Sequence, residues 1–184
     1  ELYNNVVNGG QAMAPGGSAI AVEHRAGALI ATHNTLYGGH AMALTQGALL
    51  AASATLVDNV IDAGIALSQT SAAIAITVAS TPPVRLVGNW MFGRGPREPI
   101  DVGSGTATIN DCNWSGCLET HDNVTVDPLL MDWDIGAGHL EPASLVIDSA
   151  VPTTLGWSAR LNHDLDGDPR PLDGTESGQT RSDV

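Results

Sequence analysis

Three carboxylates near the end of the chain are the clearest candidates for chemistry. Asp164, Asp166 and Asp168 recur at every second position around a glycine, and Ca²⁺ prefers hard oxygen ligands of this kind. The run is only part of an EF-hand loop, because Thr175 stands where that loop needs its last glutamate. The pattern therefore predicts either a calcium site or a plain acidic turn that ends at Pro169.

A second candidate combines cationic and aromatic residues. Arg94 and Arg97 lie close to Trp90 and Phe92 in a segment rich in glycine and proline. We expect residues 92–99 to form a loop that projects between regular repeats, where repeat proteins often carry specificity. The segment is either a contact patch for a sugar or an anion, or an ordinary solvated loop.

The two cysteines of the chain lie close together. Cys112 and Cys117 have a glycine between them, and such a pair is easily bridged in an oxidising compartment. Two thiols alone make a weak metal site. We therefore predict a small disulfide that holds the last repeat, with free thiols as the alternative.

A short phrase that recurs along the chain must position these groups. Each copy has an apolar residue three places before an asparagine and another two places after it. The asparagines of the four clear copies are Asn5, Asn34, Asn59 and Asn89. We expect a fifth, degenerate copy at residues 109–116, with Cys112 at the asparagine position. Recurrence at an irregular interval of this size is typical of a solenoid.

The residue types within the phrase indicate β-structure. The apolar residues are β-branched or large, glycine and asparagine separate short runs, and no segment sustains a helical apolar stripe. Short strands joined by bends would build a parallel β-helix. An asparagine at a repeated bend can adopt the left-handed conformation and bond to the next repeat. We predict that the four asparagines form an inward ladder; the alternative is that they are turn residues exposed to water.

The charge balance limits the partners. The chain has no lysine, seven arginines, twenty acidic residues and a formal net charge of -13. Nucleic acid is therefore a poor partner, since phosphate binding needs a basic surface. An acidic polysaccharide would be repelled unless a divalent cation bridged it. The acidity fits an extracellular habitat, or is simply that of a solvated surface.

The chain shows neither a long apolar run nor a leader. We expect no transmembrane segment and no signal peptide. The sequence starts within a repeat phrase, so we expect residues of a longer parent to cover the first repeat.

The last third resembles a known closing signature. It reads DPLL at residues 127–130, HLEPASLVID at residues 139–148 and DLDGDPRP at residues 164–171. This order resembles the end of secreted bacterial right-handed parallel β-helix proteins of the pectin-lyase-like group. The resemblance implies a β-helix that is secreted or anchored at a bacterial surface. Two departures are ASLV at residues 143–146, where that group has GSPA, and a final strand cut short at residues 182–184.

The resemblance identifies no set of catalytic residues in this chain. Lyases of this fold would need a strong base beside calcium-holding carboxylates, and hydrolases would need paired aspartates with a histidine and a lysine. The nearest group is His33, His40, Asp58 and Asp62 on adjacent repeats. We expect the two histidines to be exposed or bonded within bends, and we assign no catalytic residue.

These observations predict an all-β chain, a right-handed parallel β-helix of about five coils with an irregular C-terminal cap. Residues 1–118 would form the coils and residues 119–184 the cap of the same domain. We expect a non-catalytic module that binds a polysaccharide or a surface protein, or that serves structural display, with Ca²⁺ as its only candidate cofactor. The alternatives are a fragment of a polysaccharide lyase or glycoside hydrolase with its catalytic coils upstream, and a subunit that assembles through open coil ends.

Overall fold

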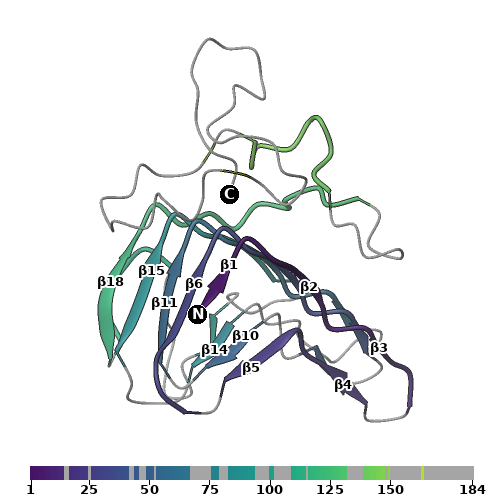
Figure 1. Cartoon of the computed structure of the whole chain (residues 1–184), viewed down its shortest axis with the longest axis horizontal. Helices are drawn as coiled ribbons and strands as arrows, with labels where there is room; N and C mark the ends of the chain where they lie inside the picture. Colours follow the sequence, from purple (N-terminus) through teal and green to yellow (C-terminus); the bar gives the residue numbers. More distant parts are fainter. Residues whose placement is uncertain are drawn as a thin grey trace.

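The regular structure of this chain consists of short β-strands joined by bends (Figure 1). The computed structural model describes residues 1–14, 17–24, 26–41, 44–45, 49–51, 53–66, 76–78, 83–93, 100–101, 109–114, 116–131, 139–147, 149 and 163. Among these residues, no helix is long and apolar enough to cross a membrane. The expectation of an all-β chain is confirmed for this part of the protein.

Three larger sheets and two smaller ones contain the strands. In spatial order, the first sheet contains β1 (Leu2–Tyr3), β6 (Leu29–Thr32), β11 (Ala54–Val57), β15 (Val84–Val87) and β18 (Cys117–His121). The second contains β16 (Trp90–Phe92), β12 (Val60–Asp62), β7 (Thr35–Tyr37) and β2 (Val6–Asn8). The third contains β17 (Ile100–Asp101), β14 (Ile76–Val78), β10 (Leu49–Ala51) and β5 (Val22–His24). The smaller sheets contain β13 (Ile65–Ala66), β8 (His40–Ala41) and β3 (Gln11–Ala12), and the pair β4 (Ser18–Ala19) and β9 (Leu44–Thr45).

Every strand pair in these sheets is parallel and joins equivalent strands of successive repeats. β11 pairs with β6 on one side and with β15 on the other, so that Leu56 lies between Ala31 and Leu86. In the second sheet Ile61 lies between Leu36 and Met91 in the same way. Parallel sheets with this connectivity are compatible with a parallel β-helix.

A left-handed residue marks the bend between the first and second sheets. The position just before each ladder asparagine has a positive φ, between 50° and 65°. The residues at this position are Asn4, His33, Asp58, Gly88 and Asp122. Asparagine, aspartate, histidine and glycine tolerate this conformation better than other residues. The expectation that the ladder asparagine itself adopts it was wrong: the preceding residue makes the turn, and the asparagine is free to point inward.

A second bend follows the second sheet and is formed by glycines. Gly10, Gly39 and Gly64 have φ values of 72°, 84° and 78°. A Cβ atom on Gly39 would lie 2.2 Å from the carbonyl oxygen of Gly10, and one on Gly64 would lie 2.1 Å from that of Gly39. Glycine is therefore required both by the backbone conformation and by the close approach of the repeats.

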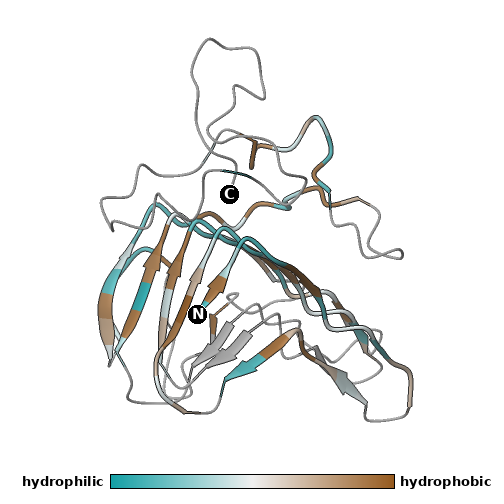
Figure 2. Cartoon of the chain, in the orientation of Figure 1, coloured by the Kyte–Doolittle hydropathy of each residue, from teal (hydrophilic) through white to brown (hydrophobic). Residues whose placement is uncertain are grey.

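One apolar core lies between the three larger sheets. Strand residues alternate between this core and the outside, as a period of two requires. Core side chains from the first sheet include Leu29, Ala31, Ala54, Leu56, Val84 and Leu86; the second sheet adds Leu36, Ile61 and Met91, and the third adds Ile100. Figure 2 shows brown, apolar segments on β6, β11 and β15, with a teal, hydrophilic segment between those of β15.

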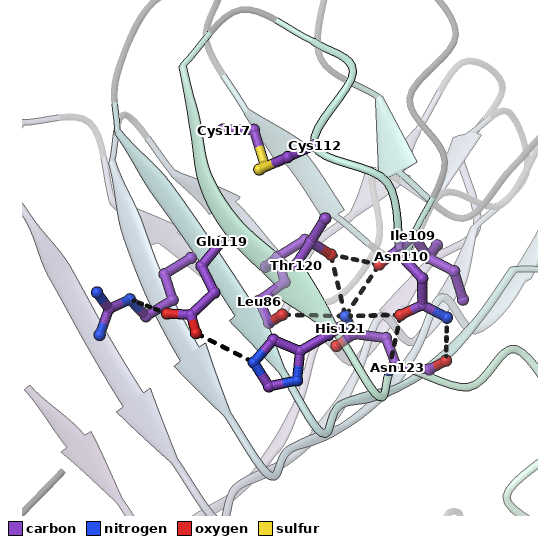
Figure 3. Close-up of a disulfide and its surroundings, with 10 residues drawn as sticks. Leu86, Ile109, Asn110, Cys112, Cys117, Glu119, Thr120, His121 and Asn123 are labelled. Atoms are coloured by element: carbon purple, nitrogen blue, oxygen red, sulfur yellow. Dashed lines mark hydrogen bonds and ion pairs between the residues drawn. A yellow bond between two sulfur atoms is a disulfide. The ribbon is translucent and has the colours of Figure 1, made fainter. Parts of the chain in front are cut away.

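A disulfide-linked segment closes one end of this core. Ile109 and Trp114 pack against it, and we call residues 109–114 the plug. The disulfide between Cys112 and Cys117 joins the plug to the start of β18 (Figure 3). At the opposite end Leu2 and Val7 of the first repeat are partly buried against the same core.

A second apolar cluster covers the outer face of the second sheet. Val60 and Trp90 point outward from β12 and β16 and pack with Val146. Leu130 and Leu140, which form an antiparallel bridge, lie against the same cluster. Part of the expected cap therefore packs along the side of the sheets.

The expected boundary between coils and cap falls inside a strand. β18 spans Cys117–His121 and pairs with β15, so residues after 118 continue the first sheet. In the described residues, the parallel pairing with the repeats continues to Val124, which forms an isolated bridge with Trp90.

Candidate functional site

The most extensive polar arrangement in the described residues is a ladder of asparagines between the first and second sheets. Each asparagine donates its backbone N–H and its side-chain Nδ2 to the Oδ1 atom of the next one. The donor–acceptor distances are 3.0 and 3.0 Å from Asn5 to Asn34, and 3.0 and 2.9 Å from Asn34 to Asn59. They are 3.1 and 2.9 Å from Asn59 to Asn89, and 3.0 and 3.1 Å from Asn89 to Asn123.

The same side chains also bond to the strands around them. Nδ2 of Asn59 donates to the carbonyl oxygen of Val57 at 3.0 Å and to that of Ala31 at 2.9 Å. Asn59 is 0% exposed, and Asn34 and Asn89 are equally buried. A buried amide is costly unless its hydrogen bonds are made. The ladder meets this requirement by linking neighbouring repeats.

The last step of the ladder differs from the sequence expectation. Asn123, which follows β18, takes the fifth position, whereas we expected Cys112 there. The interval from Asn89 is longer than expected because the plug is inserted before β18. One sequence signal pointed to the right residue: Asp122-Asn123-Val124 repeats the motif at residues 58–60.

The plug closes this end of the ladder. Asn123 donates its backbone N–H and its Nδ2 to Oδ1 of Asn110, at 2.9 and 3.3 Å. Nδ2 of Asn110 in turn donates to the backbone oxygen of Asn123 at 2.9 Å. Thr120 Oγ1 also donates to the carbonyl of Ile109 (Figure 3). Asn110 precedes Asn123 in the chain, so the plug folds back over the end of the stack.

At the other end, the first asparagine of the ladder in the described residues is Asn5. Asn5 donates through Nδ2 to Asn34 and to the carbonyl oxygen of Tyr3. Among the described residues, no donor reaches Oδ1 of Asn5. Within the part of the chain that the structure describes, β1, β2 and β3 of this repeat are the terminal strands of their sheets.

The histidine and aspartate group falls into two pairs at different bends. His33 and Asp58 are buried and occupy equivalent left-handed positions before the second sheet. Asp62 lies beside Tyr37 in the strand register, and the Tyr37 and His40 rings meet edge to face at 5.9 Å. Oδ1 of Asp62 accepts the N–H of Gly64 at 2.7 Å. The strands β7 and β12 separate the two pairs, which do not form one constellation.

A charged cluster lies on the outer face of the first sheet. A β-bulge at Leu118 sets Glu119 opposite Arg85, and the Nε atom of Arg85 lies 2.9 Å from a carboxylate oxygen of Glu119. The other oxygen of Glu119 lies 3.0 Å from Nε2 of His121 (Figure 3). On the other side of the ring, Nδ1 of His121 lies 2.8 Å from a carboxylate oxygen of Asp122. The sequence analysis did not identify this cluster, because it depends on the pairing of β15 with β18.

The two carboxylates favour the charged form of the histidine. The hydrogen bond to Asp122 is the main cause that raises the pKa of His121, and the bond to Glu119 raises it further. Both ring nitrogens face acceptors, so only the imidazolium can donate to both. Because these side chains are partly exposed to solvent, the cluster contributes a modest, pH-dependent link between β15 and β18.

Of the expected ligand patch, the structure describes only Trp90 and Phe92, and it contradicts the exposed position expected for Trp90. Trp90 is 6% exposed and belongs to the cluster with Val60 and Val146, so its ring is not available to a ligand. Phe92 is half-buried at the end of β16. Arg94 and Arg97 lie outside the described residues.

The expected calcium ligands, Asp164, Asp166 and Asp168, also lie outside the described residues. Among the residues that are described, no group of three histidine, cysteine, aspartate or glutamate side chains is placed to hold a metal ion.

Comparison with protein-family models, with curated proteins and with solved structures found no match to this chain.

Proposed function

We propose that the chain is a right-handed parallel β-helix of about five coils that acts as a non-catalytic display module at a bacterial surface. In this proposal, the stack of repeats holds its outer faces rigid so that they can contact a polysaccharide or a surface protein. The pectin-lyase-like resemblance of the last third agrees with this reading and adds Ca²⁺ as a candidate ligand of the cap.

The asparagine ladder is the observation that carries the proposal. The interior polar groups of successive repeats bond to one another, from Asn5 through Asn89 to Asn123. Buried amides in such a network stabilise the stack and exclude water from it. A side chain committed to these bonds is not available to bind or activate a substrate.

The charged groups of the described surface fit the same role. The cluster of Arg85, Glu119, His121 and Asp122 lies exposed on a sheet face, with its members paired to one another. The net charge of -13 keeps such a surface soluble and repels nucleic acid and bare polyanions. Neutral glycans, basic proteins and calcium-bridged acidic glycans are the partners that this charge permits.

A binding and turnover assay tests the proposal. The chain is mixed with insoluble neutral and acidic polysaccharides and with bacterial cell walls, with calcium and with chelator. The proposal predicts that the chain sediments with at least one of these materials and that no soluble sugar fragments appear.

Two results would contradict the display function. Release of fragments in proportion to the chain concentration would favour the lyase or hydrolase alternative. If the chain sediments with no glycan and no cell wall, in calcium or in chelator, the proposed role as a surface-binding module is contradicted.

A further inference from the structure

The start of the plug is fixed by hydrogen bonds at the end of the ladder. Asn110 and Asn123 are joined by hydrogen bonds in both directions. The carbonyl oxygen of Ile109 accepts from Oγ1 of Thr120 and, at 2.9 Å, from Nδ2 of Asn123. None of these contacts involves a sulfur atom (Figure 3). The first two residues of the plug therefore do not need the disulfide to stay in place.

The rest of the plug depends on the disulfide. For residues 112–114, the described bonds to β18 are the bridge from Cys112 to Cys117 and a turn hydrogen bond. In that bond the N–H of Cys117 donates to the oxygen of Trp114 at 3.3 Å. A bridge that closes so short a loop constrains the unfolded chain less than one that closes a long loop. Cutting the bridge would therefore release residues 112–114 and leave the repeats folded.

One side chain of the plug loses a hydrogen bond in the closed position. The ring of Trp114 packs against the apolar core, but its Nε1 atom is buried and makes no hydrogen bond to any described residue. A buried donor without an acceptor shifts the equilibrium between the closed and the open plug by roughly ten- to hundredfold toward the open state. In the open state this N–H would donate to water. Packing of the ring favours the closed plug, so the two states oppose each other.

The two sulfur atoms differ in their access to solvent. Cys112 is exposed, whereas Cys117 is half-buried at the start of β18. Exposed disulfides are the ones that thiols open most readily, and the rate depends on which sulfur is attacked. Attack at Cys112 is therefore favoured.

From these features we propose that the disulfide is a reversible redox switch that a dithiol reductant opens at Cys112. Opening it releases Trp114 from the end of the core, while Asn110 keeps its bonds to the end of the ladder. The oxidised chain would thus have a closed plug and the reduced chain a partly open one, on the same stack of repeats.

The exchange is balanced in atoms and electrons. One thiolate of the reductant attacks Sγ of Cys112, the bond to Cys117 breaks, and Cys117 leaves as a thiolate that takes a proton. The second thiolate of the reductant then attacks the reductant sulfur bound to Cys112, which leaves in the same way. The disulfide of the chain is reduced to two thiols, and the dithiol is oxidised to a disulfide.

Charge narrows the reductant further. The chain has a net charge of -13, so a neutral or cationic thiol approaches it more readily than an anionic one. The inference goes beyond the display function, because it depends only on the plug and its disulfide. Loss of glycan binding would leave it untouched.

The indole N–H of Trp114 provides the first readout. The intact chain is reduced with dithiothreitol without denaturant, and its four indole signals are followed by nuclear magnetic resonance. A Trp114→Phe variant assigns the signal of interest. We expect this proton to exchange faster by a factor of about ten or more after reduction. The amide protons of β12 should keep their protection, and reoxidation should restore the original signal.

Matched variants and a second thiol test the details. In the reduced chain, Trp114→Phe removes the buried donor but keeps a ring, so we expect iodoacetamide to alkylate Cys117 about tenfold more slowly. The exposed Cys112 is the internal control, and its alkylation rate should not change. Cysteamine, a cationic monothiol, should form its mixed disulfide mainly with Cys112 in the native chain. A Cys112→Ser, Cys117→Ser variant should resemble the reduced chain and should not respond to dithiothreitol.

Four results would overturn the proposal. Dithiothreitol could reduce the chain only in urea, which would show that the native disulfide is not accessible. The indole proton of Trp114 could keep its protection after reduction, which would show that the plug does not open. Reduction could remove the protection of β12 as well, which would show that the bridge supports the whole fold. Cysteamine could be found mainly on Cys117, which would contradict attack at Cys112.

Discussion

Replacing Asn59 by alanine removes the central step of the ladder. Its Oδ1 atom accepts two hydrogen bonds from Asn34, and its Nδ2 hydrogens are shared among the oxygens of Asn89, Val57 and Ala31. The substitution leaves the backbone N–H of Asn34 buried and without this acceptor. Because Asn59 is fully buried, water cannot easily replace the lost bonds.

The size of the effect follows from the number of bonds lost. Two bonds accepted by Oδ1 and two hydrogens on Nδ2 give a loss of about 2–6 kcal/mol in the free energy of unfolding, at ~0.5–1.5 kcal/mol for each bond. Asn5→Ala is the matched control, because Asn5 is half-buried and its side chain acts only as a donor in the hydrogen bonds to other described residues. We expect it to lose about 1–2 kcal/mol, since solvent reaches this end.

Urea unfolding followed by tryptophan fluorescence measures both losses. The chain has four tryptophans, and Trp90 is buried beside the second sheet. The dependence of the free energy of unfolding on urea concentration must be the same for both variants and the original chain, so that the free energies can be compared. Equal destabilisation by the two variants, or a loss below about 1 kcal/mol for Asn59→Ala, would refute the ladder as a stabilising element.

Three further perturbations follow from the structure. Gly10→Ala should lower the free energy of unfolding by about 1–2 kcal/mol, because of the positive φ of Gly10 alone. Gly64→Ala should lower it by clearly more in the same urea assay, because the new Cβ atom would lie 2.1 Å from a backbone oxygen. Equal losses would contradict the close packing of the glycine bend. The pKa of His121 is raised in the folded chain, so its stabilising contribution is full below the pKa of an unperturbed histidine, about 6.5, and disappears as the pH rises through the folded pKa. Thermal unfolding at several pH values should therefore show a wild-type advantage over His121→Asn at acidic pH only, of less than ~1 kcal/mol, and a difference that is constant with pH would contradict it. Replacing Cys112 and Cys117 by serine should cost about 2 kcal/mol and speed amide exchange in β18, and unchanged exchange there would show that the plug does not depend on the disulfide.

The repeated phrase was sufficient to predict the strand pattern and the ladder asparagines. Apolar residues three places before and two places after Asn34 and Asn59 are those that line the core, such as Ala31, Leu36 and Leu56. This spacing arises because one strand lies on each side of the bend, and each strand contributes one of these inward-facing residues. The pattern is local, and a local pattern can be read from one sequence.

The fifth repeat was missed because an insertion broke the period. The plug supplies an asparagine of its own, Asn110, close to the expected interval. Asn110 does join the ladder, where it accepts a hydrogen bond from Asn123, but it comes before Asn123 in the chain instead of after it. The repeat itself resumes at β18 with Asn123. Because the chain folds back here, an asparagine occurs near the expected sequence interval without belonging to a repeat. Only the strand pairing shows which asparagine belongs to the repeat.

Groups that depend on packing between distant segments could not be found from the sequence. Trp90 appeared as a surface ring, but Val146 and its neighbours cover it. The pairing of Arg85 with Glu119 depends on a bulge at Leu118 that shifts the register. Such contacts join residues far apart in the chain, and composition and spacing carry no record of them.

Hydrogen exchange of the asparagine side-chain amides tests the stacked-repeat account most directly. Nuclear magnetic resonance can follow the Nδ2 protons of each asparagine separately. The account predicts that the protons of Asn34, Asn59 and Asn89 exchange only when the chain unfolds, while those of the exposed Asn113 exchange rapidly. If the Nδ2 protons of Asn59 exchange as fast as those of Asn113, the repeats are not joined by a buried ladder and the account is wrong.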